Sequence, residues 1–384
     1  MKPPASLPGA IGRSGIREVM ELAATMTDVI HLEVGDPDLS TPAPIVEAAH
    51  RAALEGYTHY APNAGLPGLR AAIADWRRER YGLETPPEGV VVTPGAVCAL
   101  ASSVLALVDP GEEVLVPDPG WPNYVSMVRL AGARPVAYPL RPEAGYLPDP
   151  ADLEPLVTPR TKLLLVNTPA NPSGAVFPEA VVRDLVGWAA DHDLYVLSDE
   201  VYEAFVFRGR HVPARCFDPD GRVVTVAGFS KTYAMTGWRL GYAVAPPEIA
   251  ELITRLQEPL VSCAATPTQK AAEAALRLPE AVVEEMRERY RRRAELVAEV
   301  LEPAGLLPVR PAGAFYAFLD LRRLGDDSHR LARRLLERER VATAPGETFG
   351  AGGRGRLRIS LTADETSLLE GCRRILRFAA EHPD

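Results

Sequence analysis

A lysine and an arginine eight residues apart carry the clearest chemical signal in the sequence. Lys231 follows an apolar run (VVTVAG) and stands among small, aromatic and apolar residues, so we expect it to be partly desolvated. Desolvation lowers the pKa of a lysine, and a neutral amine can form a Schiff base with an aldehyde. Arg239 can hold a phosphate with its two-pronged guanidinium. An amine for an aldehyde and a guanidinium for a phosphate suit the two ends of pyridoxal phosphate, although Lys231 alone would favour a surface loop.

Two polar residues stand where apolar runs end. Asn171 opens an NPSG turn after the run LLLVN, and Asp199 follows the run YVLS. In open α/β sheets such positions face the crevice where ligands bind. A carboxylate there can keep a pyridine nitrogen protonated, which makes the ring an electron sink. The residues alone leave Glu200 as an adjacent rival, and a helix cap or a plain turn as the simpler roles of these positions.

A third signal is the junction at Gly95, Ala96 and Val97, between the run VVVT and a helical stretch. The free N–H groups and the dipole at a helix start make an anion site. Alone the signal is weak, because every strand–glycine–helix junction looks the same.

The elements that must position these residues are apolar runs alternating with helical stretches. Most of the runs are apolar throughout rather than alternating, which is typical of strands buried on both faces of a sheet. Helices are expected at 96–108 and 178–192. The alternation predicts an α/β fold with a doubly wound, mostly parallel sheet of seven strands. The runs lie at 89–93, 113–117, 134–138, 162–167, 194–198, 222–227 and 240–245.

Beyond Pro247 the pattern changes, and the tail from about Gly305 predicts a smaller α+β domain. Residues 268–301 read mostly as helix with an interruption at Pro279, and their arginines indicate a solvated face. Strands are expected at 314–319 and 356–360, with helices at 328–338 and from Asp364. We expect an N-terminal segment (1–45) that packs on the small domain, a large domain (46–285) and a small C-terminal domain (286–384).

Composition excludes several classes of protein. The 384 residues carry 42 basic and 51 acidic side chains, a net charge of −9, so nothing favours nucleic acid or an anionic membrane as partner. No stretch approaches the roughly 20 apolar residues of a membrane span, and residues 1–15 do not resemble a signal peptide. The four cysteines lack CxxC spacing and the histidines do not cluster, so neither disulfides nor a metal is expected. We expect a cytoplasmic protein.

The segment SKTYAMTGWRLGY, residues 230–242, resembles the active-site lysine segment of class I and II aminotransferases, which are fold type I enzymes of pyridoxal 5′-phosphate. The resemblance extends over nearly the whole chain. It implies that Lys231 is the catalytic residue. It assigns cofactor-binding roles to Gly95, Ala96, Val97, Asn171, Asp199, Tyr202, Ser230 and Arg239.

The resemblance implies further roles. Trp121 would stack on the pyridine ring, with Tyr124 as the alternative, and Tyr60 would reach the phosphate across a homodimer interface. Gly35, Asn171 and Arg358 would bind the substrate. On a strand Arg354, Arg356 and Arg358 share one face, so alternation cannot choose among them, and the resemblance chooses Arg358.

Two positions depart from the family. Gly228 stands where many relatives have a phosphate-binding serine. Val97 stands where some aspartate-specific relatives carry a lysine for the side-chain carboxylate of the substrate. Valine cannot bind that group, which counts against a specialist for dicarboxylic acids.

The resemblance predicts an aminotransferase that moves an amino group between an L-amino acid and a 2-oxo acid with ping-pong kinetics. The alternative is a lyase, cyclase or oxidase on the same scaffold, because the cofactor supports all of these reactions. Candidates for lining the side-chain pocket are Ile16, Val97, Phe315 and Tyr316.

Overall fold

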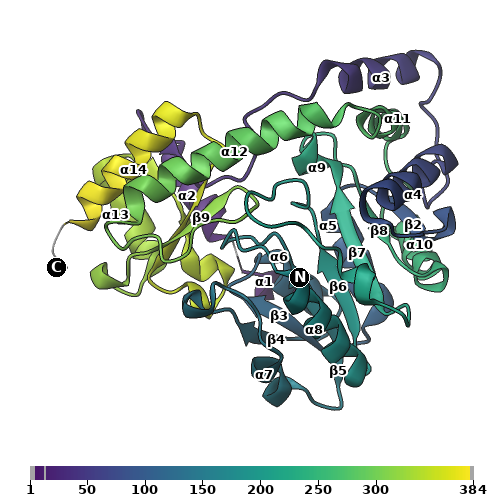
Figure 1. The fold of residues 1–384 in the computed structure, drawn as a ribbon, viewed down its shortest axis with the longest axis horizontal. Coiled ribbons are helices and arrows are strands. Elements are labelled where there is room, and N and C mark those ends of the chain that lie inside the picture. Colours follow the sequence, from purple (N-terminus) through teal and green to yellow (C-terminus); the bar gives the residue numbers. More distant parts are fainter. Residues whose placement is uncertain (1–4, 13, 381–384) are drawn as a thin grey trace, which may run out of the picture.

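The computed structural model describes residues 5–12 and 14–380, and its centre is a seven-stranded sheet (Figure 1). The strands are β2 (Val90–Thr93), β3 (Glu113–Asp118), β4 (Arg134–Pro139), β5 (Thr161–Asn167), β6 (Tyr195–Asp199), β7 (Val223–Gly228) and β8 (Gly241–Val244). Their order is β2-β8-β7-β6-β5-β3-β4. Only β8 runs antiparallel to its neighbours in this sheet, which confirms the predicted mostly parallel arrangement.

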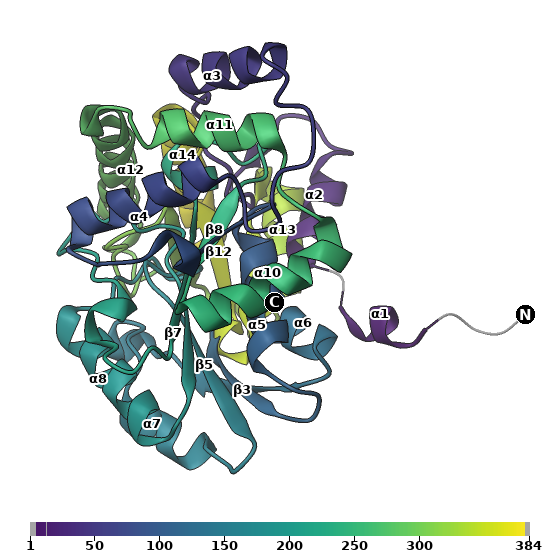
Figure 2. The ribbon, with the colours of Figure 1, turned by 90° about the vertical axis from the view of Figure 1, so that its right-hand side faces the viewer.

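Helices cover both faces of this sheet (Figure 2). One face packs against α5 (Ala96–Leu107), α6 (Asn123–Leu130) and α10 (Pro247–Val261), and the other against α7 (Pro150–Leu153) and α8 (Glu179–Asp191). In β5, Leu163 and Leu165 belong to the first core, and Leu164 and Val166 to the second. Successive side chains of a strand point to opposite faces, which is why these runs are apolar throughout.

A third layer of helices covers the end of the sheet that carries β2. It comprises α3 (Ala43–Leu54), α4 (Pro67–Tyr81) and α11 (Thr266–Ala275), which bury Ile45, Leu69 and Ala271 against the strand residues Val90 and Val244.

The two chain ends build a smaller domain. Its antiparallel sheet has β9 (Tyr316–Asp320), β11 (Ala344–Pro345) and β12 (Arg356–Ser360) in the order β11-β12-β9. β1 (Ile30–His31) pairs in parallel with β10 (Val341–Ala342). Helices α2 (Gly15–Ala23), α13 (Ser328–Glu339) and α14 (Glu365–Ala379) share its core, in which Val19 and Leu32 pack with Leu331 and Ile375. The smaller α+β domain from both ends is therefore confirmed.

The long helix α12 (Glu280–Leu301) runs from the large domain to the small one (Figure 1). The predicted boundary at residue 286 falls inside this helix, and the domain limits stay predictions. The limit of 1–45 begins at residues 1–4, outside the described residues. The remaining short helices are α1 (Leu7–Ala10) and α9 (Phe229–Thr232).

The structure confirms one expected interruption and corrects one element boundary. The helical stretch expected at 268–301 forms two helices, α11 and α12, and Pro279 caps the start of the second, where the interruption was predicted. The strand expected from residue 314 begins at Tyr316, since Ala314 has a left-handed backbone (φ 56°) that no strand accommodates. None of the described helices is both long and apolar enough to cross a membrane.

Candidate active site

A cavity of about 690 Å³ opens at the carboxyl ends of the parallel strands. Asn167, Asp199 and Gly228, the last residues of β5, β6 and β7, all line it. This is the edge at which open α/β sheets bind ligands. The small domain contributes Arg358 and Tyr316 to the wall.

Lys231 lies on the short helix α9, directly after β7, and lines the cavity. Its Nζ donates a hydrogen bond of 2.8 Å to the carbonyl of Gly35. Burial lowers the pKa of Lys231 to about 8, with a smaller opposing effect from the Asp36 carboxylate. At pH 7 roughly one tenth of these amines is therefore neutral and nucleophilic, far more than at the ordinary lysine pKa of 10.5.

Asp199 ends β6 with its side chain in the cavity lining. One carboxylate oxygen accepts a hydrogen bond of 2.6 Å from the Tyr124 hydroxyl, and the other accepts one from the Val201 amide. Burial raises the pKa of Asp199 to about 6. Tyr124 is thus a fully buried hydrogen-bond partner of Asp199, and its part as the alternative ring stacker stays a prediction. The only signal in the sequence that Tyr124 belongs to this site is its position three residues after Trp121.

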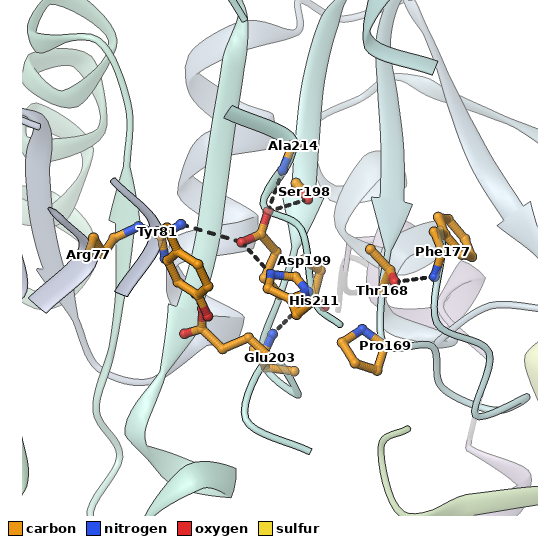
Figure 3. Close-up of polar contacts among 12 residues, drawn as sticks. Arg77, Tyr81, Thr168, Pro169, Phe177, Ser198, Asp199, Glu203, His211 and Ala214 are labelled. Carbon is orange, nitrogen blue, oxygen red and sulfur yellow. Dashed lines mark hydrogen bonds and ion pairs between the residues drawn. The ribbon is translucent and has the colours of Figure 1, made fainter. Parts of the chain in front are cut away.

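Glu200 is buried and does not line the cavity, but belongs to a buried polar cluster with Arg77, Ser198 and His211, which are labelled in Figure 3. Its carboxylate accepts hydrogen bonds from Ser198 Oγ (2.9 Å), the Ala214 amide (3.1 Å) and Arg77 (3.4 Å), and pairs with His211 Nε2 (3.2 Å). Adjacent residues of a strand face opposite ways, which separates Glu200 from Asp199.

The same cluster has the ligand types of a metal site. Carboxylate oxygens of Glu200 and Glu203 and a ring nitrogen of His211 lie within 4.8 Å of one another. The guanidinium of Arg77 lies 3.4 Å from Glu200 and 3.6 Å from Glu203. A cation already neutralises these buried carboxylates, so they have no need of a metal.

The anion site predicted at Gly95, Ala96 and Val97 lies at the start of helix α5. Gly95 caps α5 in a left-handed conformation (φ 84°), and a Cβ there would come within 2.5 Å of an Arg239 guanidinium nitrogen. A Cβ on Gly241 would come within 2.3 Å of the Ala96 amide. Gly95 therefore leaves room for the Arg239 guanidinium, and Gly241 lets strand β8 approach the start of α5. The N–H groups at this helix start, together with the guanidinium, can bind an anion. Ala96, Val97, Ser230 and Arg239 all line the cavity beside them.

Arg358 is buried on β12 and faces the same cavity. It donates to Asn171 Oδ1 at 3.2 Å and to the carbonyl of Glu33, and its guanidinium lies 4.3 Å from the Tyr316 ring centre. Of the three candidate arginines only Arg358 lines the cavity. Arg354 precedes the strand, and Arg356 donates to the Gly352 carbonyl, so the expected three-residue face is wrong in part.

The other cofactor-side candidates take distinct places. Tyr202 lines the cavity, and its hydroxyl lies 2.9 Å from that of Tyr316. Trp121 also lines it, edge-on to the Tyr124 ring at 5.4 Å between ring centres. A Cβ on Gly228 would meet Gly241 Cα at 3.2 Å, so β7 and β8 approach closely where the family serine is missing.

Two candidates lie outside the cavity lining. Tyr60 is 89% exposed, so within one chain it is not brought to the site. Phe315 is fully buried behind the wall and packs against Tyr202 and Tyr290, which corrects its expected place in the side-chain pocket. The other pocket candidates, Ile16, Val97 and Tyr316, do line the cavity.

Comparison with known proteins agrees with this geometry. The family model for aminotransferase class I and II matches residues 27–375. The chain belongs to this family.

Similar proteins extend the match over both chain lengths. The aspartate/prephenate aminotransferase of Thermus thermophilus is 41% identical over 363 residues, 94% of this chain and 93% of its own. The arginine–pyruvate transaminase of Pseudomonas aeruginosa is 41% identical over 92% of this chain and 91% of its own. The solved aspartate aminotransferase from Thermus thermophilus with maleate superposes with a TM-score of 0.94 at 40% identity, covering 98% of this chain and 100% of that one.

The protein is therefore an aminotransferase with the fold that the sequence predicted. The relatives named here are all amino-group transferases, which favours transfer over the lyase, cyclase and oxidase alternatives.

Proposed function

We propose that this aminotransferase holds pyridoxal 5′-phosphate in the cavity and uses it to move an amino group between an L-amino acid and a 2-oxo acid. The observation that carries the proposal is that four kinds of group meet at one cavity. They are the buried amine of Lys231, the anion site at Gly95, the buried carboxylate of Asp199 and a second arginine, Arg358. These groups match an aldehyde, a phosphate, a ring nitrogen and a substrate carboxylate in turn.

Each end of the cofactor has a residue to hold it. Arg239 and the amides of Ala96 and Val97 would hold the phosphate, with Ser230 nearby. Asp199 would pair with the ring nitrogen, and Tyr202 and Asn171 would donate to the ring oxygen. Trp121 would stack on the ring face. Lys231 Nζ would hold the aldehyde carbon. When bound, pyridoxal phosphate supplies the electron sink for the charge left on the substrate Cα.

Substrate binding falls to the residues from the chain ends. Arg358 would take the α-carboxylate on its guanidinium fork, oriented by Asn171 and by the Tyr316 ring. Gly35 lies alongside, because its carbonyl accepts the hydrogen bond from Lys231. The amine and the carboxylate-binding arginine are thus held at the same end of the cavity.

Lys231 then acts as the proton carrier. Its Nζ, neutral in part because burial lowers its pKa to about 8, takes the proton from the substrate Cα. The same atom would deliver the proton to the carbon of the cofactor that carried the aldehyde, one nitrogen away from Cα, so one residue serves as base and then as acid. The second half of the cycle repeats these steps in reverse with an oxo acid, which predicts ping-pong kinetics.

The proposal includes a homodimer with shared sites. Several large apolar or aromatic side chains on α3, on α10 and at Tyr60 are exposed, and exposed apolar groups of this size often mark an interface. Tyr60, exposed here, would complete the phosphate site of the partner. The exposed fractions are 77% for Leu54, 89% for Tyr60 and 53% for Leu260. We also propose a cytoplasmic location, supported by four free cysteines.

The absorption spectrum of the loaded protein, with amino donors added one at a time, tests the function. Transamination predicts that the visible band bleaches with a donor and returns with a 2-oxo acid, and that Lys231→Ala abolishes turnover while Lys162→Ala, on β5, does not. Release of ammonia in place of amino exchange would indicate lyase chemistry instead. Wild-type turnover by Lys231→Ala would refute the assigned role.

Mixing two defective variants tests the shared site. Homodimers of Lys231→Ala and of Tyr60→Ala are each expected to be impaired. A hybrid of the two has one site that combines both defects and one that has neither, so mixing should restore activity. Failure to regain activity in a sample that light scattering shows to be dimeric would contradict the sharing of Tyr60.

A further inference from the structure

The loop that carries Arg239 has an unusual backbone that must be held from outside. This loop joins α9 to β8 and spans residues 233–240. Two of its residues that are not glycine, Ala234 (φ 50°) and Arg239 (φ 54°), have left-handed backbones. L-residues rarely adopt this conformation, and it persists only where the surrounding structure holds it. The shape of the loop therefore depends on its contacts with other segments.

The chain just before α3 supplies such contacts, 193 to 200 positions earlier in the sequence. Thr41 Oγ1 donates to the carbonyl of Ala234 at 2.6 Å and accepts from Trp238 Nε1 at 3.0 Å. Asp36 Oδ1 accepts a hydrogen bond of 2.6 Å from Thr236 Oγ1. Three residues of the loop are thus tied to the N-terminal part of the chain.

Thr236 connects this N-terminal part to the phosphate-binding arginine. Its hydroxyl donates to Asp36, and its backbone carbonyl accepts a hydrogen bond of 2.8 Å from Arg239 Nη1. Thr236 and Arg239 both line the active-site cavity. The other terminal nitrogen of the guanidinium, Nη2, lies against Gly95 at the start of α5. The position of the Thr236 carbonyl therefore sets the direction in which the guanidinium points.

The charge of Asp36 and its hydrogen bond have opposite consequences for a phosphate in this cavity. Asp36 is exposed, and its carboxylate is close enough to Lys231 to act on the pKa of the amine. Acting by charge alone, a carboxylate so near the site would repel a phosphate. Acting through its hydrogen bond, it fixes Thr236 and so favours phosphate binding by Arg239. The two effects differ in sign, so an experiment can separate them.

We propose that Asp36 is a positioning residue for the cofactor phosphate and that it acts through Thr236 and Arg239. The inference rests on the proposed function, in which Arg239 holds the phosphate. Asp36 accepts from the Thr236 hydroxyl, and the Thr236 carbonyl in turn orients the guanidinium. A guanidinium that is oriented before binding loses less conformational freedom when it pairs with the phosphate.

A comparison of pyridoxal phosphate with pyridoxal, which lacks the phosphate, tests the proposal. The ratio of their affinities for the cofactor-free protein separates the phosphate end from the aldehyde end at Lys231. Thr236→Val removes the hydroxyl with little change of shape and should lower this ratio about threefold to tenfold, the range for one hydrogen bond. Asp36→Ala should also lower it, although the loss of a negative charge by itself would raise it. Asp36→Asn keeps an acceptor oxygen and should retain part of the wild-type ratio.

A double variant tests whether the two residues act as one unit. Asp36→Ala combined with Thr236→Val should show no further fall in the ratio below that of Thr236→Val, because the route through the hydroxyl is already broken. Ser367→Ala is the matched control and should leave the ratio unchanged. It breaks a hydrogen bond of the same length, 2.6 Å, between a hydroxyl and the Asp364 carboxylate outside the cavity lining.

Inorganic phosphate gives a second readout that involves no aldehyde. Used as a competitor of pyridoxal phosphate for the cofactor-free protein, it should bind to Thr236→Val more weakly than to wild type by a similar factor. An unchanged affinity of the same variant for pyridoxal would show that Lys231 and the rest of the cavity are intact.

Three results would overturn the proposal alone. An equal loss of affinity for both aldehydes would mean that the pair only supports the fold of the loop. A ratio that stays the same or rises in Thr236→Val or in Asp36→Ala would mean that the pair does not orient the arginine. A further fall in the double variant would mean that Asp36 acts by another route. A wild type that binds both aldehydes equally well would refute the phosphate site, and with it the proposed function.

Discussion

The substitution Asp199→Asn should stabilise the cofactor-free protein and at the same time abolish its catalysis. Asp199 is buried at the end of β6, and burial raises its pKa from 3.8 to about 6. The folded state therefore binds a proton that the unfolded chain has already lost, and keeping Asp199 ionised in the fold costs free energy. Asparagine has the same shape and no charge, and the Tyr124 hydroxyl can rotate to accept from its amide.

The size and the sign follow from linkage. A shift of about 2.2 pKa units corresponds to about 3 kcal/mol, the cost of keeping Asp199 ionised above pH 6. The cost falls to about 1.6 kcal/mol at pH 5 and about 0.6 kcal/mol at pH 4, because protonation in the fold relieves it. Allowing for weaker hydrogen bonds of the amide, Asp199→Asn should gain about 2 to 3 kcal/mol at pH 7 and much less at pH 4.

Urea unfolding of the cofactor-free protein, followed from pH 4 to pH 8, measures this difference. Asp184→Asn, an exposed aspartate on α8, is the matched control and should change stability little at any pH. A gain for Asp199→Asn that is the same at every pH, or a loss at pH 7, would refute the argument that burial burdens this carboxylate. The loaded variant should transaminate far more slowly, since an amide cannot keep the ring nitrogen protonated.

Three further predictions concern neighbours of the same cavity. Tyr124→Phe removes the 2.6 Å hydrogen bond to Asp199 and should raise the pKa of that carboxyl further, by about 1 to 2 units; infrared titration of the cofactor-free protein would show it, and an unmoved midpoint would contradict it. Lys231 should react with acylating reagents with a midpoint near pH 8 in the cofactor-free protein, whereas a midpoint near 10.5 would mean that burial has no effect. Gly241→Ala places a Cβ within 2.3 Å of the Ala96 amide, so titration should show cofactor affinity at least about tenfold weaker, and undiminished affinity would mean that α5 shifts without cost.

The sequence predicted the large domain well because local patterns decide it. The run at 163–166 (LLLV) is apolar at every position, and β5 indeed packs on two faces, with Leu163 in one core and Leu164 in the other. The choice of Asp199 over Glu200 came from the family resemblance, because the residues alone left both carboxylates open, and in the structure only Asp199 lines the cavity.

What the sequence could not give are contacts between distant segments. Tyr124 reaches Asp199 across 75 positions, and no local pattern distinguishes that contact from ring stacking. Phe315 and Tyr316 are adjacent and both aromatic, yet only Tyr316 faces the cavity, because the left-handed residue Ala314 sets the phase of β9.

The residues that line the cavity come from both the large and the small domain. The proposed cofactor-side groups stand at the ends of central strands: Asp199 ends β6, Lys231 follows β7 and Arg239 precedes β8. The proposed substrate-side groups Gly35 and Arg358 come from the two chain ends, which share a separate core. A substitution on β12 can therefore change how the substrate carboxylate is held without moving the amine or the phosphate cradle.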